Sequence, residues 1–590
     1  MKNKKLTNQI IYTNEARCQD CYRCVRVCPV NAIMMKEGQA QVVSDKCILC
    51  GTCIRECPQD AKSYRRDIER VKRLLVNHES IAVSIAPSFA TVYEDWKRER
   101  IPSLLRKLGF THISETSEAA GFVAEETAKI INTRPENTHI ATACPAFVNY
   151  AEKYNPSLVS KLVPVVSPMI AHAMRIKAKF GDDTRVVFIG PCIAKKDEAE
   201  KSEFAGLIDA VLTFEELNIW IEEEDVDIKM LETSDFDDLP TENSSLFPLV
   251  GGLIRTASLS TDLLSDTMLP VSGVEEINEM VKTLEKSNHN FVVEPLFCAQ
   301  GCTNGPGIDC CKTVFEKKAD LLEYTAQRKT KKTDDDKLNV DLSTRYRIRA
   351  EAAERFSEAE IRKVLEKTGK AEEENQLNCG ACGYDSCRDK AIAVLMGMAE
   401  YNMCLPYVRR MAEQRTDKII ESSPNGIVIL DEQLRILHMN PAFRKFFKTT
   451  SSICGKSISY LMDPELFIKL REGEKDKIEQ TVVYDNYNLV THQLMYKLRS
   501  ENQLVGVFVN ITKNTKDNQK LDDLKQKTII QAQELLEHQV KMAQKLAMYL
   551  GESTAKGEEL VDNLMKYTKD EQVTNKINNN RWLWDIYTSK

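Results

Sequence analysis

The sequence predicts a multidomain protein that combines α/β and α+β folds. Its 590 residues are long enough for about four domains. Between residues 80 and 350, short apolar runs typical of buried strands alternate with helical stretches, which predicts an α/β domain with largely parallel strands. Nineteen cysteines, most of them closely spaced, indicate metal-binding modules in and around this domain.

The composition excludes several classes of protein. With 42% hydrophobic residues, 29% charged residues and a net charge of −7, the chain has no basic surplus for nucleic acid. No apolar run approaches the roughly 20 residues of a membrane span, and the N-terminus lacks the apolar core of a secretory signal. We therefore expect a cytoplasmic protein whose clustered cysteines bind metal rather than form disulfides.

The first cysteine clusters lie in residues 1–70. CQDCYRCVRVCP and CILCGTCIRECP repeat the C-x2-C-x2-C-x3-C-P pattern of a two-cluster bacterial ferredoxin domain. The crossing rule of this pattern predicts one [4Fe-4S] cubane on Cys18, Cys21, Cys24 and Cys57 and another on Cys47, Cys50, Cys53 and Cys28. Zinc knuckles are the alternative, disfavoured by the spacing and by the two prolines that follow the repeats.

Four isolated cysteines mark a further site in the α/β region. The runs IAVSIAP, THIATAC, RVVFIGPC and FPLVGG are predicted as buried strands, and SEAAGFVAEETAKIIN and SPMIAHAMRIKAKF as helices. Two of the strands lead into Cys144 and Cys192, and ligands bind at the carboxyl ends of strands in open α/β sheets. Further along, Cys298 and Cys302 lie four residues apart among glycines that let the backbone approach a bound group.

This region resembles the catalytic domain of the [FeFe]-hydrogenases, and we assign the domain to residues 75–325. The segments that correspond to the family's three signature loops are, in chain order, ATACPAF, GPCIAKKDE and EPLFCAQGCTNGPG. The segments IAPSF and GGLIRTA are also similar to the family. The resemblance implies an H-cluster whose cubane is held by Cys144, Cys192, Cys298 and Cys302. Cys302 would also bridge to a two-iron subsite that carries CO, cyanide and a dithiolate. Lys195 would donate to an iron-bound cyanide, with Glu198 as its carboxylate partner because a lone buried lysine is costly.

The same resemblance identifies departures around the expected proton route. Ala143 replaces the proton-donating cysteine of the family. The other departures are Phe147 for tryptophan, Gly190 and Leu296 for methionines, Lys129 for a glutamate and Val163 for a serine, while Glu126 keeps a carboxylate. Ala143 and Val163 cannot carry a proton, and one missing donor typically costs about 10²–10⁴-fold in general acid–base catalysis. There are two alternatives to a broken route. Water takes the place of the missing residues, or the substitutions are neutral drift in an ordinary enzyme.

A second small module is predicted at residues 371–410. Its CGACG loop resembles the four-cysteine [4Fe-4S] domain of electron-transfer and corrinoid proteins. Cys379, Cys382, Cys387 and Cys404 would be the ligands, with a helix over residues 388–403 returning the last of them. Zinc is the alternative metal. Residues 326–370 are predicted as a charged linker with one or two solvated helices, and Cys310 and Cys311 as incidental thiols.

Residues 413–513 resemble a PAS domain in the segments NGIVILD, HMNPAF and VGVFVNIT. We expect a ligand-free dimerisation and relay domain, with haem at His438 or Cys454 as the alternative. Residues 514–590 are predicted as a helical signalling tail, in which apolar residues between 529 and 550 suit a short coiled coil or a plain amphipathic helix. Trp582 and Trp584 either form a tip that docks on a partner or simply pack within the protein.

Together these features predict a sensory, PAS-containing [FeFe]-hydrogenase with low turnover in H2 oxidation and proton reduction. The expected partners are H2 and protons, a ferredoxin, the hydrogenase maturation enzymes, and a regulatory protein phosphatase or kinase, since the chain carries no kinase or DNA-binding motif. A homodimer through the PAS domain and tail is also expected. The alternatives are a catalytic, ferredoxin-linked hydrogenase and a non-catalytic iron–sulfur scaffold without the two-iron subsite.

Overall fold

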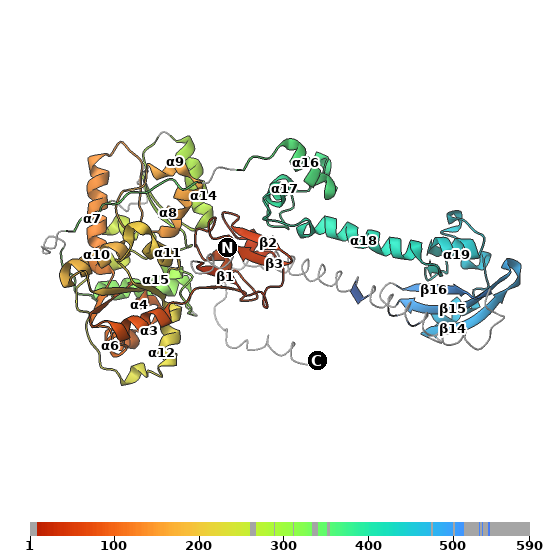
Figure 1. The fold of residues 1–590 in the computed structure, drawn as a ribbon, viewed down its shortest axis with the longest axis horizontal. Coiled ribbons are helices and arrows are strands. Elements are labelled where there is room, and N and C mark those ends of the chain that lie inside the picture. The colour runs from red at the N-terminus through yellow and green to blue at the C-terminus, as the bar shows by residue number, and fades with distance from the viewer. Residues whose placement is uncertain are drawn as a thin grey trace, which may run out of the picture. The chain divides into compact units, whose positions relative to one another are not determined.

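The computed structural model confirms the predicted multidomain fold (Figure 1). It describes residues 9–259, 267–287, 289–310, 312–332, 340–350, 354–473, 476–498 and 502–512, with residues 530, 534, 541 and 542. The chain forms two compact units, residues 1–407 and 408–590. No helix among the described residues is long and apolar enough to cross a membrane.

The ferredoxin-like part of the first unit repeats one small motif. Two antiparallel pairs, β1 with β4 and β2 with β3, flank two one-turn helices. The elements are β1 (Ile11–Thr13), α1 (Arg23–Arg26), β2 (Ile33–Lys36), β3 (Gln39–Val42), α2 (Thr52–Arg55) and β4 (Lys62–Tyr64). Each helix follows a residue with positive φ, Tyr22 (57°) or Gly51 (76°), so the two halves of the sequence repeat adopt the same turn.

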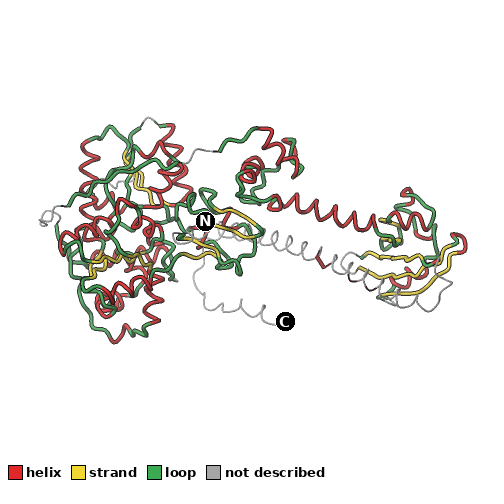
Figure 2. Tube along the Cα trace, viewed as in Figure 1, coloured by secondary structure: helices red, strands yellow, loops and turns green. Residues whose placement is uncertain are grey.

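The α/β part contains two parallel sheets, where the sequence pattern alone did not distinguish one sheet from two. The larger has the strand order β6-β5-β8-β9 and the smaller β10-β11-β7 (Figure 2, strands in yellow). The strands are β5 (Ile81–Ile85), β6 (His112–Glu115), β7 (His139–Ile140), β8 (Arg185–Gly190), β9 (Ala210–Thr213), β10 (Met268–Ser272) and β11 (Val292–Leu296). β5 is buried along its whole length, as expected of a central parallel strand.

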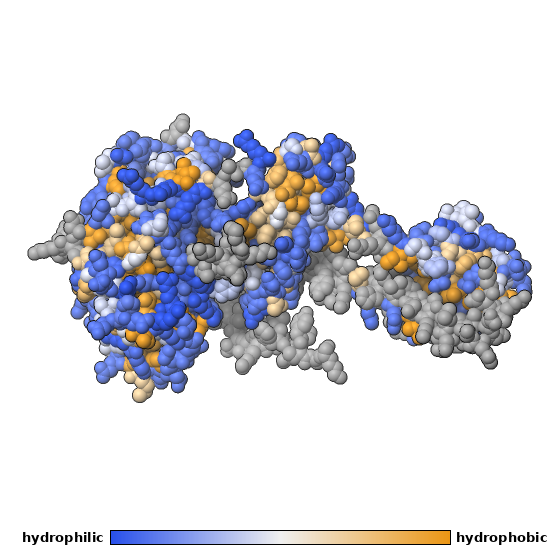
Figure 3. All heavy atoms as spheres, viewed as in Figure 1, coloured by the Kyte–Doolittle hydropathy of each residue, from blue (hydrophilic) through white to orange (hydrophobic). Residues whose placement is uncertain are grey.

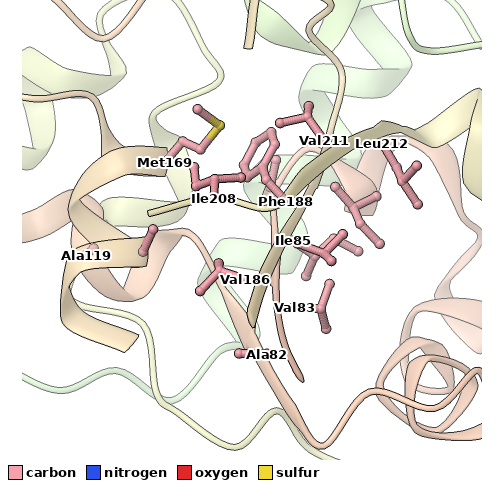
Figure 4. Packing of buried hydrophobic residues seen from close by; sticks show 14 of the residues in the cluster. Ala82, Val83, Ile85, Ala119, Met169, Val186, Phe188, Ile208, Val211 and Leu212 are labelled. Carbon is pink, nitrogen blue, oxygen red and sulfur yellow. The ribbon is translucent and has the colours of Figure 1, made fainter. Parts of the chain in front are cut away.

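Helices cover these sheets and close the core. They are α3 (Ile68–Asn77), α4 (Phe89–Val92), α5 (Asp95–Arg98), α6 (Ile101–Lys107), α7 (Ser117–Thr133), α8 (Pro145–Tyr154), α9 (Pro156–Val159), α10 (Pro168–Phe180), α11 (Ala194–Glu200), α12 (Phe214–Glu223), α13 (Gly252–Thr256), α14 (Gly273–Lys286) and α15 (Val314–Gln327). The predicted helices are thus present as α7 and α10. Figure 4 shows the core beside β5, β8 and β9, where Val83, Val186 and Leu212 are fully buried with Ala119 of α7 and Met169 of α10.

One predicted strand is wrong. The run FPLVGG, residues 247–252, forms turns that lead into α13 instead of a strand. Gly251 has a φ of +80°, and a Cβ on Gly252 would lie 2.0 Å from the Leu246 carbonyl oxygen. The glycines therefore serve a tight turn, and an apolar run alone could not distinguish this from a strand.

The predicted charged linker is also corrected in part. Within it, α16 (Glu358–Lys367) is exposed on one side only, because Ile361, Val364 and Leu365 pack in one cluster with Ala391 of α17 (Cys387–Leu395). The helix expected over residues 388–403 ends at Leu395, and the chain then turns at Gly397, which has a φ of +69°. Both helices therefore belong to the four-cysteine part, residues 354–407.

The four-cysteine part packs against the ferredoxin-like part. Hydrogen bonds between described residues join the two: Met35 N donates to Met398 O (2.9 Å), Glu37 N to Glu400 Oε1 (2.8 Å) and Arg26 Nη1 to Ala381 O (3.1 Å). The Met35 bond uses the backbone of β2, so the module docks on the ferredoxin sheet. Buried Tyr384 joins the same apolar cluster as Val25 and Ile33. The two cysteine-rich parts thus share one core.

The second unit has the fold expected of a PAS domain. A five-stranded antiparallel sheet has the order β13-β12-β16-β15-β14. Its elements are β12 (Gly426–Leu430), β13 (Ile436–Met439), α19 (Pro441–Phe446), α20 (Glu465–Arg471), β14 (Lys477–Tyr484), β15 (Leu489–Leu498) and β16 (Gln503–Asn510). Fully buried Asn440 caps α19, where its Oδ1 accepts from Phe443 N (2.9 Å), and its Nδ2 donates to Ile420 O (3.0 Å) at the end of α18 (Leu405–Ser422). This side chain ties α18 to the sheet of its own unit.

Polar and charged residues cover most of the visible face of the molecule, with smaller hydrophobic areas between them (Figure 3). The apolar positions of the predicted coiled coil between residues 529 and 550, together with Cys311, Trp582 and Trp584, lie outside the described residues.

Gly383→Ala should loosen the docking of the four-cysteine part. A Cβ at Gly383 would lie 2.6 Å from Val25 Cγ1 and 3.1 Å from Arg26 N, and such overpacking typically costs about 1–3 kcal/mol. We expect the amide of Met35, which bonds Met398, to exchange with deuterium roughly tenfold faster in the full chain.

Gly380→Ala is the matched control, because Gly380 also has a positive φ (+67°) but an added Cβ would have no atom within 4 Å. Equal exchange of the Met35 amide in the two variants would contradict the proposed contact.

Candidate metal centre

The four isolated cysteines of the α/β part meet where two sheets end. Cys144 follows β7, Cys192 follows β8, and Cys298 follows β11, each within four residues of the strand. Cys302 begins the short 3-10 turn Cys302–Asn304. The carboxyl ends of parallel strands from both sheets therefore supply the thiols, a placement that the sequence predicted for two of them.

These thiols are buried beside one another. Burial raises the pKa of Cys298 well above its ordinary value, and nearby Cys192, Cys302 and Cys144 raise that pKa further. Burial likewise raises the pKa of Cys192 to about 12, with Cys144 adding to the effect. Thiolates are the metal-binding form, so anionic sulfur here requires a compensating cation. Among the described residues, no three Cys, His, Asp or Glu side chains converge closely enough for a single metal ion.

The glycines of this loop also have a packing role. The sequence predicts that they let the backbone approach a bound group, and in the structure they let it approach other loops. A Cβ on Gly301 would lie 2.4 Å from Pro248 O, and one on Gly305 would lie 2.5 Å from Pro191 O. Cys302 N donates to Pro248 O at 2.8 Å. The cysteine loop is thereby locked against the loops before α13 and after β8.

A mainly apolar cavity of about 90 Å³ lies next to Cys192 and Cys302. A single water molecule needs about 10–15 Å³ on the same measure, so the cavity has room for a group the size of roughly six waters or more. It is lined by Ala86, Pro87, Ser88, Thr116, Ser117, Ala120, Ala143, Pro168, Met169, Phe188, Pro191, Cys192, Lys195, Ser244, Phe247, Pro248, Leu296 and Cys302.

Lys195 brings a buried positive charge to this cavity. Its Nζ donates to Glu198 Oε2 at 2.7 Å, to Ser167 Oγ at 2.8 Å and to Ala143 O at 3.4 Å. The Lys195 and Glu198 side chains are only 10% and 8% exposed. The predicted pair is therefore present, three residues apart on α11. Ser167 was missed, although its place before Pro168 is a sequence signal for the start of a helix.

Ser88 is a second polar group at the cavity that sequence reasoning missed. Its Oγ is fully buried and has no hydrogen-bond partner among the described residues. Buried hydroxyls are normally satisfied, so this one is available to a bound group. An ammonium, a spare hydroxyl and two thiols in a mainly apolar cavity suit a compact group with several hydrogen-bond acceptors. The residues present therefore fit the cyanide-bearing two-iron subsite implied by the resemblance.

The structure explains several of the departures. Ala143 lines the cavity at the position expected for a proton donor, and Val163 is 1% exposed with no side-chain polar atom. At Gly190 a Cβ would lie 2.6 Å from the Phe188 ring, so the expected methionine cannot be accommodated while Phe188 lines the cavity. Leu296 lines the cavity as well.

Glu126 and Lys129 lie elsewhere. Their side chains are 44% and 61% exposed, they lie within 3.7 Å of each other, and both line a surface cleft of about 750 Å³. Neither lines the cavity beside Cys302. Phe147 is fully buried in the apolar core next to Tyr150.

The two predicted ferredoxin sets come together as the crossing rule expects. Burial raises the pKa of Cys24; Lys62 opposes the rise, and Cys21, Cys18 and Cys57 add to it. Burial raises the pKa of Cys53 well above its ordinary value, and Cys50, Cys47 and Cys28 raise it further. Each set of four thiols is thus close in space, which a repeat of independent zinc knuckles would not give.

The second of these sets adjoins the loop of Cys298 and Cys302. Arg55 Nη1 donates to Asn304 O at 2.8 Å, and a Cβ on Gly51 would lie 2.5 Å from Pro306 Cβ. Arg55 also lowers the pKa of Cys298, against the larger effects of burial and the neighbouring thiols. The ferredoxin-like part is thus fitted directly onto the four-cysteine loop of the α/β part.

The thiols of Cys379, Cys382, Cys387 and Cys404 surround a small cavity of about 30 Å³. Burial raises the pKa of Cys382, and Cys404 and Cys379 contribute to the rise. Tyr384 lines this cavity and packs in the same apolar cluster as Val25 and Ile33 of the ferredoxin-like part. Burial raises its pKa to about 12, and nearby Cys382 and Cys28 raise it further. The predicted ligand set is therefore assembled, next to a ferredoxin thiol.

The remaining predicted thiols stay apart from these sites. Cys310 Sγ lies 3.9 Å from Thr91 O, which suits an incidental thiol. Cys454 is exposed, and His438 is half-buried with no partner for Nδ1 among the described residues.

Comparisons with known families agree with this architecture. The model of the iron-only hydrogenase large subunit, C-terminal domain, matches residues 79–306. The chain contains an iron-only hydrogenase large-subunit domain. A 4Fe-4S dicluster domain matches residues 17–61, a putative Fe-S cluster domain 375–406 and a PAS domain 414–480. The chain is therefore an iron–sulfur protein with a hydrogenase-like domain and a PAS domain.

Among curated relatives, iron hydrogenase 1 of Clostridium pasteurianum is 28% identical over 397 residues, covering 55% of this chain and 68% of the relative. The periplasmic [Fe] hydrogenase large subunit of Nitratidesulfovibrio vulgaris is 27% identical over 282 residues, covering 42% and 66%. The cytosolic Fe-S cluster assembly factor NAR1 of Vanderwaltozyma polyspora is 35% identical over 105 residues, covering 18% and 20%. A solved [FeFe]-hydrogenase structure aligns with 49% of this chain and 100% of its own at 15% identity and a TM-score of 0.40.

Glu198→Gln should destabilise the protein strongly. It leaves the buried Lys195 ammonium without its carboxylate, and breaking a buried ion pair typically costs about 3–5 kcal/mol. Denaturant unfolding of the full chain, followed by circular dichroism, measures the change.

Glu223→Gln is the control, because it breaks the exposed pair with Lys72 (2.9 Å) and should cost no more than about 1 kcal/mol. Equal losses in the two variants would argue against a strongly coupled pair at Lys195.

Proposed function

We propose that this protein is an H2-responsive iron–sulfur protein of the [FeFe]-hydrogenase type. Cys144, Cys192, Cys298 and Cys302 would hold a [4Fe-4S] cubane, and Cys302 would also bind a two-iron subsite in the adjoining cavity. When bound, that subsite would supply the redox centre for the reversible splitting of H2 into two protons and two electrons. Maturation enzymes would have to deliver it.

The observation that carries this proposal is the Lys195 site. A lysine buried with one carboxylate is costly to maintain. Lys195 borders a cavity that also presents Cys302 and the Ser88 hydroxyl, which has no partner in the part of the chain that the structure describes. A bound group with anionic acceptors would complete the hydrogen bonding of both side chains. A simple cubane scaffold would not need the cavity or its charge.

The cavity also accounts for the low turnover that we propose. Ala143 presents no titratable group at the expected proton-donor position, and Val163 offers none further along. General acid–base catalysis requires a donor within hydrogen-bond reach. The site would bind H2 with slow proton exchange, which suits detection more than bulk conversion.

Electrons would leave along the chain of cysteine sites. Arg55 and Gly51 fix the set of Cys47, Cys50, Cys53 and Cys28 against the cysteine loop. Tyr384 lies between Cys28 and Cys382, so the four-cysteine site would continue the route as a third electron-transfer [4Fe-4S] cluster. A soluble ferredoxin would exchange electrons with this chain of clusters.

The four-cysteine site also occupies a position suited to signalling. Cys404 is followed directly by α18, which runs from Leu405 to Ser422 and is held at its far end by Asn440 of the PAS domain. A redox change of the cluster held by Cys404 would shift the conformational equilibrium of this helix. A homodimer formed through the PAS domain and tail would present the change to a protein phosphatase or kinase. Such coupling requires the two states to differ in free energy with and without H2.

A non-catalytic iron–sulfur protein is the second candidate. Part of the chain is similar to the cytosolic Fe-S cluster assembly factor NAR1, and Ala143 removes the expected proton donor. In that case the cysteine sites would carry clusters without the two-iron subsite, and the cavity would stay free of it. A fully active ferredoxin-linked hydrogenase is disfavoured by the same alanine.

Infrared spectroscopy of the matured full chain separates the candidates. We expect bands of iron-bound CO and cyanide, and we expect Lys195→Ala to lose them while the cysteine-bound iron persists. Matured protein without such bands would support the iron–sulfur protein candidate instead.

Ala143→Cys should raise the rate of H2 turnover. A thiol at this position restores a titratable group at the cavity, and one such group typically contributes about 10²-fold or more. H2 evolution with a reduced dye measures the change. Ala143→Ser controls for size with a weaker acid, and a rate equal to that of the unsubstituted chain in both variants would show that proton delivery at Ala143 does not limit turnover.

A further inference from the structure

A cavity that splits H2 must exchange protons with solvent, and the expected route through Ala143 and Val163 is blocked. This inference rests on the proposed function and concerns the residues that would replace that route. Among the cavity-lining residues, Thr116 begins a chain of hydrogen-bonded side chains that leads away from the cavity.

The chain runs through the centre of the larger sheet. Thr116 Oγ1 and Ser84 Oγ are 2.7 Å apart, and Ser84 Oγ is 2.7 Å from His172 Nδ1. On the other side of the ring, His172 Nε2 is 3.1 Å from Ser114 Oγ. These side chains come from β5, β6, α10 and the residue before α7, and none of the four residues is more than 5% exposed. Each of these buried groups therefore has a hydrogen-bond partner in the chain.

The far end of the chain meets a buried ion cluster. His172 Nε2 is 3.8 Å from Glu118 Oε2, so a small rotation of either side chain would bring the two atoms within hydrogen-bond distance. Glu118 in turn pairs with Arg175 and Lys331, each at 2.8 Å. The Lys331 side chain is 23% exposed, so the cluster leads from the core toward solvent.

We propose that Thr116, Ser84 and His172 form a proton relay between the cavity and Glu118. The oxidation of H2 yields two protons and two electrons, and the electrons leave through the iron–sulfur sites. Each proton enters the Thr116 hydroxyl, which passes its own proton to Ser84, and Ser84 passes its proton to His172 Nδ1. The ring releases its Nε2 proton to the Glu118 carboxylate, which passes it to solvent water because the cationic Arg175 and Lys331 cannot accept it. Every hydroxyl ends with the number of protons it had at the start.

The protonation of His172 suits this role. Burial lowers its pKa to about 4, although Glu118 and Asp238 oppose that shift; His112 and Arg175 reinforce it. The ring is therefore neutral at pH 7, with one nitrogen that accepts a proton and one that donates. Rotation of the hydroxyls and a tautomer change reset the relay after each transfer.

A purely structural role is the alternative, since these groups also satisfy each other inside the core. The test must therefore separate loss of a hydroxyl from loss of packing. Thr116→Val removes the hydroxyl of this cavity-lining residue at nearly constant volume, whereas Thr116→Ser keeps it. Thr184→Val is the matched control: Thr184 is 3% exposed and bonds Ser80 at 3.3 Å near the start of β5, outside the relay.

The experiment uses the matured full chain of each variant. Infrared bands of iron-bound CO and cyanide report whether the two-iron subsite is present. The rate at which those bands shift after a pH jump without H2, and the rate of H2 turnover, report proton delivery. We expect Thr116→Val and Ser84→Ala to keep the bands but to slow both rates by about 10²-fold, with Thr116→Ser and Thr184→Val within about twofold of the unsubstituted chain.

Three results would overturn the relay. Intact bands with unchanged rates in Thr116→Val and Ser84→Ala would remove the relay and leave the proposed function standing. Absence of the bands from the unsubstituted matured chain would remove the proposed function, and the relay with it. Slowing by Thr184→Val as large as that by Thr116→Val would identify a packing effect and also reject the relay.

Discussion

The burial of thiols between two parallel sheets is the constraint on which the structure of the first unit depends. Burial and nearby cysteine thiols raise the pKa values of Cys192 and Cys298. Their free thiolate forms would therefore be strongly unfavourable. In the proposed cubane, iron would remove this cost and would tie the end of β8 to the end of β11. The loops at Pro191 and Pro248, which both line the cavity, lie beside these strand ends. Folding of the α/β part and cluster binding are therefore expected to be coupled.

The same constraint organises the parts around it. The ferredoxin-like part reaches the cysteine loop through Arg55, and the four-cysteine part reaches the ferredoxin-like part through the backbone of Met35. Each contact brings one set of thiols next to another, with Tyr384 between the last two. A chain of closely packed cysteine sites is the arrangement that electron transfer requires. The PAS domain adds a fold suited to dimerisation and relay, which a hydrogenase devoted to bulk turnover would not need.

Much of this could be predicted from the sequence, because metal-binding motifs are local and chemically specific. The spacing of Cys18, Cys21 and Cys24 was enough to predict that they lie near Cys57. The segment from Lys195 to Glu198 was enough to predict the ion pair between these two residues. Features that depend on tertiary packing could not be predicted in this way. The run FPLVGG has the composition of a strand, yet the close approach of Gly252 to the Leu246 carbonyl makes it a turn. The segment around α16 is mostly charged, and the burial of its three apolar residues depends on their packing against α17. Ser88 and His172 are ordinary residues in sequence and become relevant only through what surrounds them.

The central claim is that H2 at the cysteine-bound centre changes the state of the signalling part. Amide hydrogen–deuterium exchange of α18 and the PAS strands, in matured full chain under H2 and under argon, tests it most directly. We predict that exchange in residues 405–422 differs between the two gases, and that protein without the two-iron subsite shows no difference. Identical exchange under both gases in matured protein that carries the CO and cyanide bands would contradict the claim.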